Sequence, residues 1–142
     1  MLKESQIQRL LSEARRARQL AYAPYSQFPV GAALMTKDGH IFAGCNIENA
    51  AYGVSMCAER VAVFKAVSEG HVHFAALALV SGSRIATPCG ACRQVLAEFN
   101  LNMPLIMANL VGEYRIATVS ELLPAAFGKD KLNAKVGQNE KG

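Results

Sequence analysis

Three of the four cysteines stand where their thiolates could gather around a metal ion. Cys89 and Cys92 form a C-x-x-C segment at the start of a predicted helix, and Cys57 opens another predicted helix. The free N–H groups and the positive dipole end of a helix start lower thiol pKa values. If the two helix starts meet at one end of a sheet, three thiolates converge. Three protein ligands plus one open position is the stoichiometry of a catalytic zinc site, so we expect Zn²⁺ there.

Glu59 is the candidate proton carrier beside those cysteines. It follows Cys57 by two residues in the first turn of the same predicted helix. Because residues i and i+2 do not share a helix face, Glu59 should not ligate the same ion. It can instead lean over the open position and transfer protons to and from water. An acidic residue in a first turn often serves only the helix dipole, but beside an open zinc position the catalytic role is favoured.

The fourth cysteine and the three histidines are expected to lie outside the zinc site. Cys45 belongs to the wholly apolar side of its predicted strand, which indicates a core thiol. His40 occupies a hairpin end, and His71 and His73 come just after a helix stop. A histidine that binds metal needs a partner that orients its ring, and no carboxylate is obviously placed to do so.

The elements that must position these residues follow from hydrophobic periodicity and turn signals. Ser5 to Gln8 fits a capping box at the start of an amphipathic helix, and Asp38-Gly39 is a strong hairpin signal. The order of elements predicts an α/β fold of three layers, α/β/α, with a five-stranded mixed sheet covered by helices. We expect helices at 5–21, 57–69, 90–99 and 120–124, and strands at 30–36, 41–47, 74–80, 105–111 and 114–119.

Composition favours one folded domain. The chain has 142 residues, of which 51% are hydrophobic and 18% charged, which excludes a disordered or fibrous chain. No stretch supplies the ~20 apolar residues that cross a bilayer, and the N-terminus lacks the apolar core of a signal peptide. We therefore expect a cytoplasmic protein without a membrane partner. The sequence becomes polar and charged after Gly128, which predicts a single domain at 1–128 and a loosely held tail at 129–142.

The positive charge lies at the two ends of the chain. The formal net charge is +4, to which residues 1–20 contribute +3 and residues 129–142 contribute +2, leaving −1 for the middle. A groove that follows a phosphate backbone would place its Lys and Arg around the working site. The charge distribution therefore argues against a nucleic-acid partner.

Two motifs carry a resemblance to a known family. Cys57-Ala58-Glu59, followed later by Pro88-Cys89-Gly90-Ala91-Cys92, resembles the zinc motif of cytidine deaminases. Segments at 25–33, 46–49 and 122–127 extend the similarity over nearly the whole chain, whose length is similar to that of the short, homotetrameric members. The resemblance implies a cytidine deaminase-like fold and the zinc-dependent hydrolysis of cytidine and deoxycytidine to uridine and deoxyuridine, with release of ammonia, in pyrimidine salvage.

The resemblance also assigns roles at the zinc site. It implies that Cys57, Cys89 and Cys92 hold one Zn²⁺ per subunit, and that Glu59 transfers protons from the activated water to N3 and to the leaving amine. Three thiolates on Zn²⁺ sum to −1, which weakens the acidity of the water. The helix starts oppose this effect, and Arg60, with Arg93 as the other candidate, is expected to donate to the cysteine sulfurs.

Further residues match the substrate contacts of the family. By resemblance Phe28 packs against the pyrimidine ring, and Asn46 and Glu48 hydrogen-bond the ribose. Tyr52 and Phe127 match residues that reach the site of a neighbouring subunit. The resemblance therefore implies a small nucleoside substrate and a homotetramer whose sites are completed by neighbouring subunits. A polar strand end for Asn46 and Glu48, and ordinary core or interface packing for the aromatic residues, are the other interpretations.

Three other functions remain open at this point. A deaminase for a nucleoside antibiotic such as blasticidin S has a similar zinc motif, although Phe28 and the Asn46/Glu48 pair favour an ordinary nucleoside. A nonenzymatic binding module with structural zinc would need a fourth protein ligand, for which Cys45 is the candidate. A thiol–disulfide oxidoreductase could use the C-x-x-C segment alone, but would leave Glu59 without a role.

Overall fold

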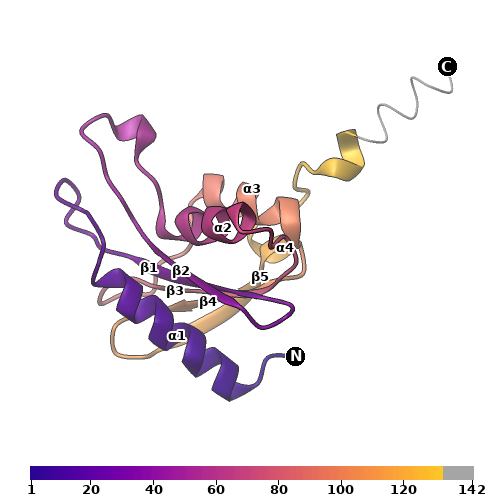
Figure 1. The fold of residues 1–142 in the computed structure, drawn as a ribbon, viewed down its shortest axis with the longest axis horizontal. Coiled ribbons are helices and arrows are strands. Elements are labelled where there is room, and N and C mark those ends of the chain that lie inside the picture. The colour runs from indigo at the N-terminus through magenta and orange to yellow at the C-terminus, as the bar shows by residue number, and fades with distance from the viewer. Residues whose placement is uncertain (133–142) are drawn as a thin grey trace, which may run out of the picture.

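The computed structural model describes residues 1–132, which form a three-layer α/β/α arrangement (Figure 1). Helix α1 covers one face of the sheet, and α2, α3 and α4 lie over the other. The predicted α/β class is confirmed. The helices are α1 (Glu4–Arg18), α2 (Ala58–Ser68), α3 (Gly90–Phe99), α4 (Val119–Leu122) and the short 3₁₀ helix η1 (Tyr52–Val54), and the strands are β1 (Gly31–Thr36), β2 (Ile41–Cys45), β3 (Phe74–Val80), β4 (Pro104–Ala108) and β5 (Tyr114–Thr118).

The sheet is mixed and has the strand order β2-β1-β3-β4-β5. Strand β1 pairs antiparallel with β2 and β3, and β4 pairs antiparallel with β5. The parallel pair is β3 and β4, because α3 connects them as a crossover helix. Strands β1 and β3 are buried on both faces, which explains their continuous apolar sequences.

Two apolar clusters hold the layers together. Leu10, Leu11 and Ala14 of α1 pack with Ala33 and Ile106 on one face of the sheet. On the other face the buried side chains come from α2, α3 and the strands below them, and include Ala62, Val63, Leu77, Leu96 and Leu105. The second cluster anchors the two helices that begin directly after the predicted metal ligands Cys57 and Cys89.

Two glycines allow helices to approach the sheet closely. A Cβ at Gly44 of β2 would lie 2.6 Å from the backbone nitrogen of Ala62, and one at Gly31 of β1 would lie 1.9 Å from the carbonyl oxygen of Ala14. Both distances are well inside van der Waals contact, so any side chain would push α2 or α1 outward. The absence of a Cβ at Gly44 thus sets how near α2, with Cys57 at its start, lies to the sheet.

Helix α1 begins earlier than the predicted capping box. Its first residue is Glu4, and the Lys3 N–H donates to the side-chain oxygen of Gln6 (2.9 Å). The cap is therefore built around Lys3 and Gln6, and the prediction that Ser5 starts the helix is wrong. Gln6 stands three residues after Lys3, as Gln8 does after Ser5, and so makes the contact expected of the capping box two residues earlier.

Two strands end earlier than predicted, β2 at Cys45 and β4 at Ala108. After β4, the side-chain oxygen of Asn109 accepts from the N–H groups of Val111 (3.2 Å) and Glu113 (3.0 Å). These local bonds turn the chain after β4. They replace the hydrogen bonds between strands that the apolar sequence up to residue 111 predicted.

The predicted tail begins at Lys129, whose ammonium lies 3.7 Å from the carboxylate of Glu98 on α3. Residues 133–142 lie outside the described residues, so the domain boundary at 128 stays a prediction. None of the helices formed by residues 1–132 combines the length and apolarity needed to cross a membrane.

Candidate active site

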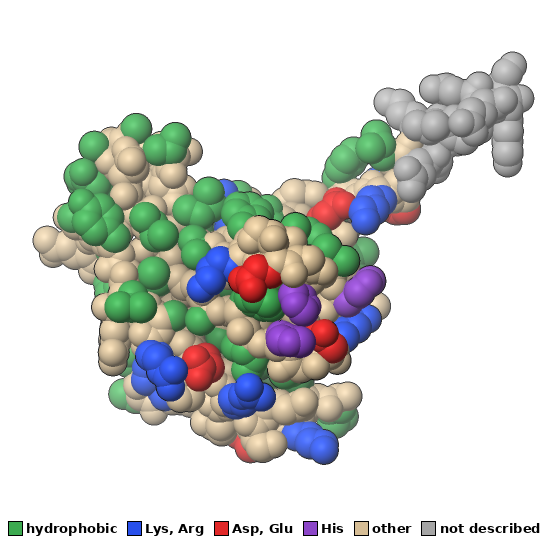
Figure 2. Space-filling model, viewed as in Figure 1, with side chains coloured by type: hydrophobic (Ala, Val, Ile, Leu, Met, Phe, Trp, Pro, Cys, Tyr) green, Lys and Arg blue, Asp and Glu red, His purple; other side chains and the backbone are tan. Residues whose placement is uncertain are grey.

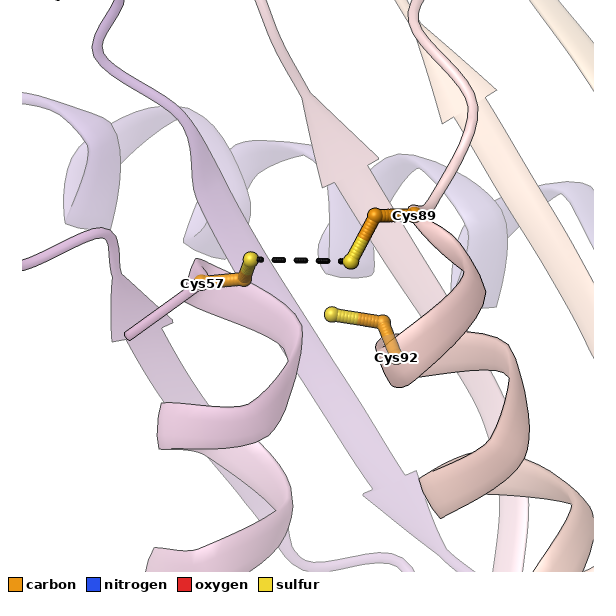
Figure 3. A group of neighbouring side chains, drawn as sticks. All are labelled: Cys57, Cys89 and Cys92. Atoms are coloured by element: carbon orange, nitrogen blue, oxygen red, sulfur yellow. Dashed lines mark hydrogen bonds between the residues drawn. The ribbon is translucent and has the colours of Figure 1, made fainter. Parts of the chain in front are cut away.

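The three predicted metal ligands converge at the starts of two helices (Figure 3). Cys57 caps α2, Cys89 caps α3, and Cys92 lies in the first turn of α3. The sulfurs of Cys57 and Cys89 are 3.8 Å apart, and one ligand atom from each of the three residues lies within 4.8 Å of the others. A set of three thiolates at this spacing fits a zinc ion with one further position left for a non-protein ligand.

The environment of the sulfurs favours loss of the first proton from Cys57. The Cys92 thiol donates to the Cys57 sulfur, and with help from Arg60 this lowers the pKa of Cys57 to about 5 although partial burial opposes it. The same hydrogen bond, together with burial, raises the pKa of Cys92. A cation bound by all three sulfurs would displace the proton that Cys92 retains, since metal ligands must be deprotonated.

Arg60 and Arg93 have different roles in the structure. The guanidinium of Arg60 donates to the sulfur of Cys57 (3.4 Å), and this contact raises the pKa of Arg60. Arg93 instead donates to the carbonyl oxygens of Pro88 and Leu122, both at 2.7 Å. Of the two arginines considered, Arg60 is therefore the one that meets a cysteine sulfur, and Arg93 ties the start of α3 to α4.

Glu59 is buried beside the cysteines but does not belong to the group of ligand atoms. Only 5% of its surface is exposed. Burial, reinforced by the negative charge of Cys57, raises the pKa of its carboxyl group. Glu59 lines one hollow together with Cys57 and Cys89. A carboxyl group with a raised pKa is suited to accept and return a proton there.

A hollow of about 250 Å³ brings most of the predicted residues together. Cys57, Glu59 and Cys89 line it at the starts of α2 and α3, together with Phe28, Asn46 and Glu48. Ser26, Ala86 and Thr87 also line it, although none of them was a predicted site residue. Nothing in their types distinguishes them from ordinary loop residues, so only the folded arrangement identifies them.

Asn46 lines the hollow and also holds the neighbouring 28–30 segment in place. The side-chain oxygen of Asn46 accepts from the Val30 N–H (2.8 Å), and its amide nitrogen donates to the Phe28 carbonyl oxygen (2.9 Å). Asn46 thereby holds the segment that carries Phe28. An amide nitrogen has two donor hydrogens, so one is left to face a ligand in the hollow.

Glu48 holds the beginning of the same segment in place. Its carboxylate accepts from the N–H groups of Tyr25 and Ser26, each at 3.0 Å, and from the Ser26 hydroxyl. The hydroxyl contact is the main cause that lowers the pKa of Glu48. The carboxylate is therefore charged at neutral pH. Gln27, in the middle of the segment, has a φ of 54°, a conformation that non-glycine residues adopt at a cost and that recurs at functional sites.

Tyr52 and Phe127 are not brought into this hollow. Tyr52 belongs to η1, is 73% exposed and meets the ring of Tyr25 edge-on at 6.0 Å. Phe127 follows α4, is 59% exposed and lines a different hollow, beside the end of α3. Within one chain both rings are left open to solvent.

Cys45 and the histidines lie apart from the three sulfurs. Cys45 is only half-buried because β2 is an edge strand, so it is not the fully enclosed core thiol that the strand pattern predicted. Partial burial raises the pKa of its thiol. The histidines lie beyond the far end of α2, where Asp38 stands beside two of them. The expectation that no carboxylate orients them is wrong, because the hairpin turn brings Asp38 back over His40.

Comparisons with known proteins agree on one family. Residues 4–107 match the model of the cytidine and deoxycytidylate deaminase zinc-binding region. A cytidine deaminase of Sporosarcina psychrophila is 54% identical over 129 residues, covering 89% of this chain and 95% of that protein. The crystal structure of a cytidine deaminase from Burkholderia pseudomallei has a TM-score of 0.83 and 45% identity, covering 89% of this chain and 100% of that one. A blasticidin-S deaminase of Bacillus cereus is 29% identical over 110 residues.

Proposed function

The chain belongs to the cytidine and deoxycytidylate deaminase family and catalyses zinc-dependent deamination of cytidine, and on that premise we propose which residues perform each step. The observation that carries the proposal is the buried Glu59 carboxyl group in the same hollow as Cys57 and Cys89. The overall reaction joins water to cytidine and yields uridine and ammonia.

Cys57, Cys89 and Cys92 hold the zinc ion. Their spacing and their position at two helix starts support this assignment, because the positive helix ends offset part of the thiolate charge. The Arg60 guanidinium offsets more of it through its contact with Cys57. When bound, zinc supplies the Lewis acidity that makes a water molecule nucleophilic at neutral pH.

Glu59 carries protons between that water and the substrate. Its carboxylate accepts a proton as the water oxygen adds to C4 of the pyrimidine, and its carboxyl group donates to N3. A second transfer moves the proton of the new C4 hydroxyl group to the exocyclic nitrogen, so that the C4–N bond breaks, the C4 carbonyl forms and ammonia leaves. Burial supports this role, because a carboxyl group with a raised pKa gives and takes protons with a smaller free-energy cost near pH 7.

Phe28, Asn46 and Glu48 bind the nucleoside. The ring of Phe28 packs against the pyrimidine at the side of the hollow, while Asn46 and Glu48 hydrogen-bond the ribose from its rim. The same contacts accept deoxycytidine, since a 3′-hydroxyl group is present in both sugars. The hydrogen bonds of Asn46 and Glu48 to the 25–30 segment hold that side of the hollow in place before substrate binds.

The alternative functions have less support. A structural-zinc module needs a fourth protein ligand, and Cys45 lies outside the group formed by the other three cysteines. A thiol–disulfide oxidoreductase would leave Cys57 and Glu59 unused at the centre of the hollow. A blasticidin S-type activity is less well supported, because the identity to the blasticidin-S deaminase is 29%, against 54% to the cytidine deaminase of Sporosarcina psychrophila.

We place the enzyme in a homotetramer in the cytoplasm, serving pyrimidine salvage. The exposed rings of Tyr52 and Phe127 support an oligomer, because each would be covered if it reached the hollow of a neighbouring subunit. A nucleoside is uncharged, and the near-neutral middle of the chain suits it better than it suits a nucleic acid.

The test is Glu59→Gln, with Glu69→Gln at the exposed far end of the same helix as the matched control. Glu59→Gln should keep its zinc and lose about 10²- to 10⁴-fold of turnover, the contribution typical of a general acid–base group. Zinc content and ammonia release from cytidine measure the two effects, and Glu69→Gln should match the parent in both. Full activity in Glu59→Gln would falsify the assignment.

A further inference from the structure

A second group of metal-binding side chains lies at the opposite end of α2 from the cysteines. It consists of Asp38 and His40 in the β1–β2 hairpin and His71 in the connection from α2 to β3. Helix α2 has 11 residues, so its length separates the two groups by about 16 Å at 1.5 Å per residue. Histidine side chains gather beside an acidic side chain on the face shown in Figure 2. The proposed deamination uses none of them.

The carboxylate of Asp38 lies between the two imidazoles. One oxygen is 3.2 Å from Nδ1 of His40, and the other is 3.8 Å from Nδ1 of His71. One ligand atom from each of the three residues lies within 4.8 Å of the others. Two ligands of a single ion stand roughly 3 to 4 Å apart when each metal–ligand distance is about 2.1 Å, so small side-chain rotations would suffice.

Neighbouring groups hold these side chains in place. The Thr36 hydroxyl donates to Asp38, and it also accepts from the backbone N–H of His40 (3.0 Å). That threonine is itself buried. The ring of Phe42 packs 5.1 Å from that of His71, whose backbone N–H donates to the Ala66 carbonyl oxygen (2.9 Å). Such supporting contacts are what orients ligands before a metal binds.

The charge state also suits a cation. Hydrogen bonds from Thr36 and His40 lower the pKa of Asp38 to about 2, so its carboxylate is ionised at neutral pH. Asp38 and His71 line a hollow of about 460 Å³, and Lys37, which also lines it, brings a positive charge that opposes a cation.

We propose that Asp38, His40 and His71 form a second metal site, which binds one divalent transition-metal ion through two imidazole nitrogens and a carboxylate oxygen. Imidazole ligands favour zinc, nickel, cobalt or copper over magnesium and calcium. The remaining positions on the ion face solvent, because the carboxylate and the His40 ring are more than half exposed. A bound ion joins the hairpin to the end of α2 and so stabilises the fold by mass action.

The experiment titrates Ni²⁺ into the zinc-loaded enzyme by calorimetry, in the parent and in three variants. His40→Asn and His71→Asn each remove one ligand. His73→Asn is the matched control, because His73 lines the same hollow but does not belong to the ligand group. All three changes fall on surface segments, and thermal unfolding without added metal checks that each variant folds.

The parent and His73→Asn should bind one Ni²⁺ per subunit, and both should show a Tm that rises with Ni²⁺. His40→Asn and His71→Asn should lose at least about tenfold in affinity, since even the loss of a residue that merely supports a ligand costs that much. Zinc content and deaminase activity are followed throughout, to detect nickel entering the cysteine site. Equal uptake by all four proteins, or no uptake by the parent, would overturn the proposal.

Discussion

The two halves of the hollow are built in different ways. The half that holds the cysteines comes from the first turns of α2 and α3, and there Cys92 and Glu59 are 0% and 5% exposed. The half that faces the nucleoside comes from loops, and there Phe28 is 48% exposed. The first half rests on the apolar cluster beneath two helices, whereas the second is held by the side chains of Asn46 and Glu48.

This difference indicates what one chain completes by itself. Metal ligands must be held within a fraction of an ångström, and helix starts packed on a sheet provide that rigidity. Loops with exposed aromatic rings leave apolar surface uncovered, and surfaces of this kind usually mark contact with another molecule. We therefore expect the metal half to depend on residues within one chain and the nucleoside half to depend on neighbouring subunits.

The largest effect should come from Cys92→Ala in the metal half. Cys92 is fully buried and is one of the three proposed ligands, so its loss should release the zinc and reduce turnover by more than about 10⁴-fold, beyond the effect of losing the proposed general base alone. Cys45→Ala is the matched control and should retain zinc and activity. Metal analysis and ammonia release measure both, and a zinc-loaded, active Cys92→Ala protein would contradict the ligand set.

Phe127→Ala should have the next largest effect if the neighbouring subunit completes the site. Truncating a central interface aromatic residue costs about 2 kcal/mol or more, which is roughly thirtyfold in kcat/KM. Val111→Ala removes an even more exposed apolar side chain elsewhere and should change little.

Mixed oligomers sharpen this test of the nucleoside half. When Phe127→Ala and Glu59→Gln chains assemble together, some hollows combine an intact Glu59 with an intact Phe127 from the neighbour. Ammonia release should then exceed the sum of the separate proteins. No gain on mixing, or an active monomer in sedimentation, would place Phe127 in its own chain's site or outside any site.

Glu48→Ala should have a smaller effect that depends on the sugar. Losing a hydrogen bond to a charged group costs about 1.5 kcal/mol at the low end, which is roughly tenfold in KM. The loss should be larger for cytidine than for a nucleoside without sugar hydroxyl groups. Steady-state kinetics on both substrates distinguish recognition of the ribose from loosening of the 25–30 segment, because the latter would weaken both substrates equally.

Arg60→Gln should have the smallest effect of the four. The contact from Arg60 to the Cys57 sulfur is one hydrogen bond at 3.4 Å, so its removal should cost about 1 kcal/mol, or several-fold in zinc retention. Chelator-driven release of zinc measures it, together with the pH dependence of the rate. Arg16→Gln, on the exposed face of α1, is the control. Unchanged zinc release and an unchanged pH profile would remove Arg60 from the metal half.

Much of the metal half could be predicted from the residues alone. Cys57, Cys89 and Cys92 each stand at a helix start, and local signals such as periodicity and loop composition locate helix starts well. The spacing of Glu59 from Cys57 likewise excludes it as a ligand, since helix geometry is a local property. The order of elements also predicted the mixed five-stranded sheet.

Other features depended on which distant segments pack together, and only the tertiary structure decided them. The sequence left Arg60 and Arg93 as alternatives, and the packing of α3 against α4 assigned Arg93 to the Leu122 carbonyl oxygen. The sequence left Asn46 and Glu48 as ribose ligands, by resemblance, or as a polar strand end, whereas the fold also makes them the supports of the segment around Phe28.

The same limit applies to the histidines. Asp38 and His71 are 33 positions apart, and their meeting depends on how the hairpin packs beside the end of α2. Local signals along a chain report the backbone conformation of nearby residues. Contacts between distant residues are set by the close packing of whole elements, which no short stretch of sequence contains. The sequence by itself therefore determined the starts of α2 and α3 and the zinc chemistry they carry, and the tertiary structure determined which side chains surround and support them.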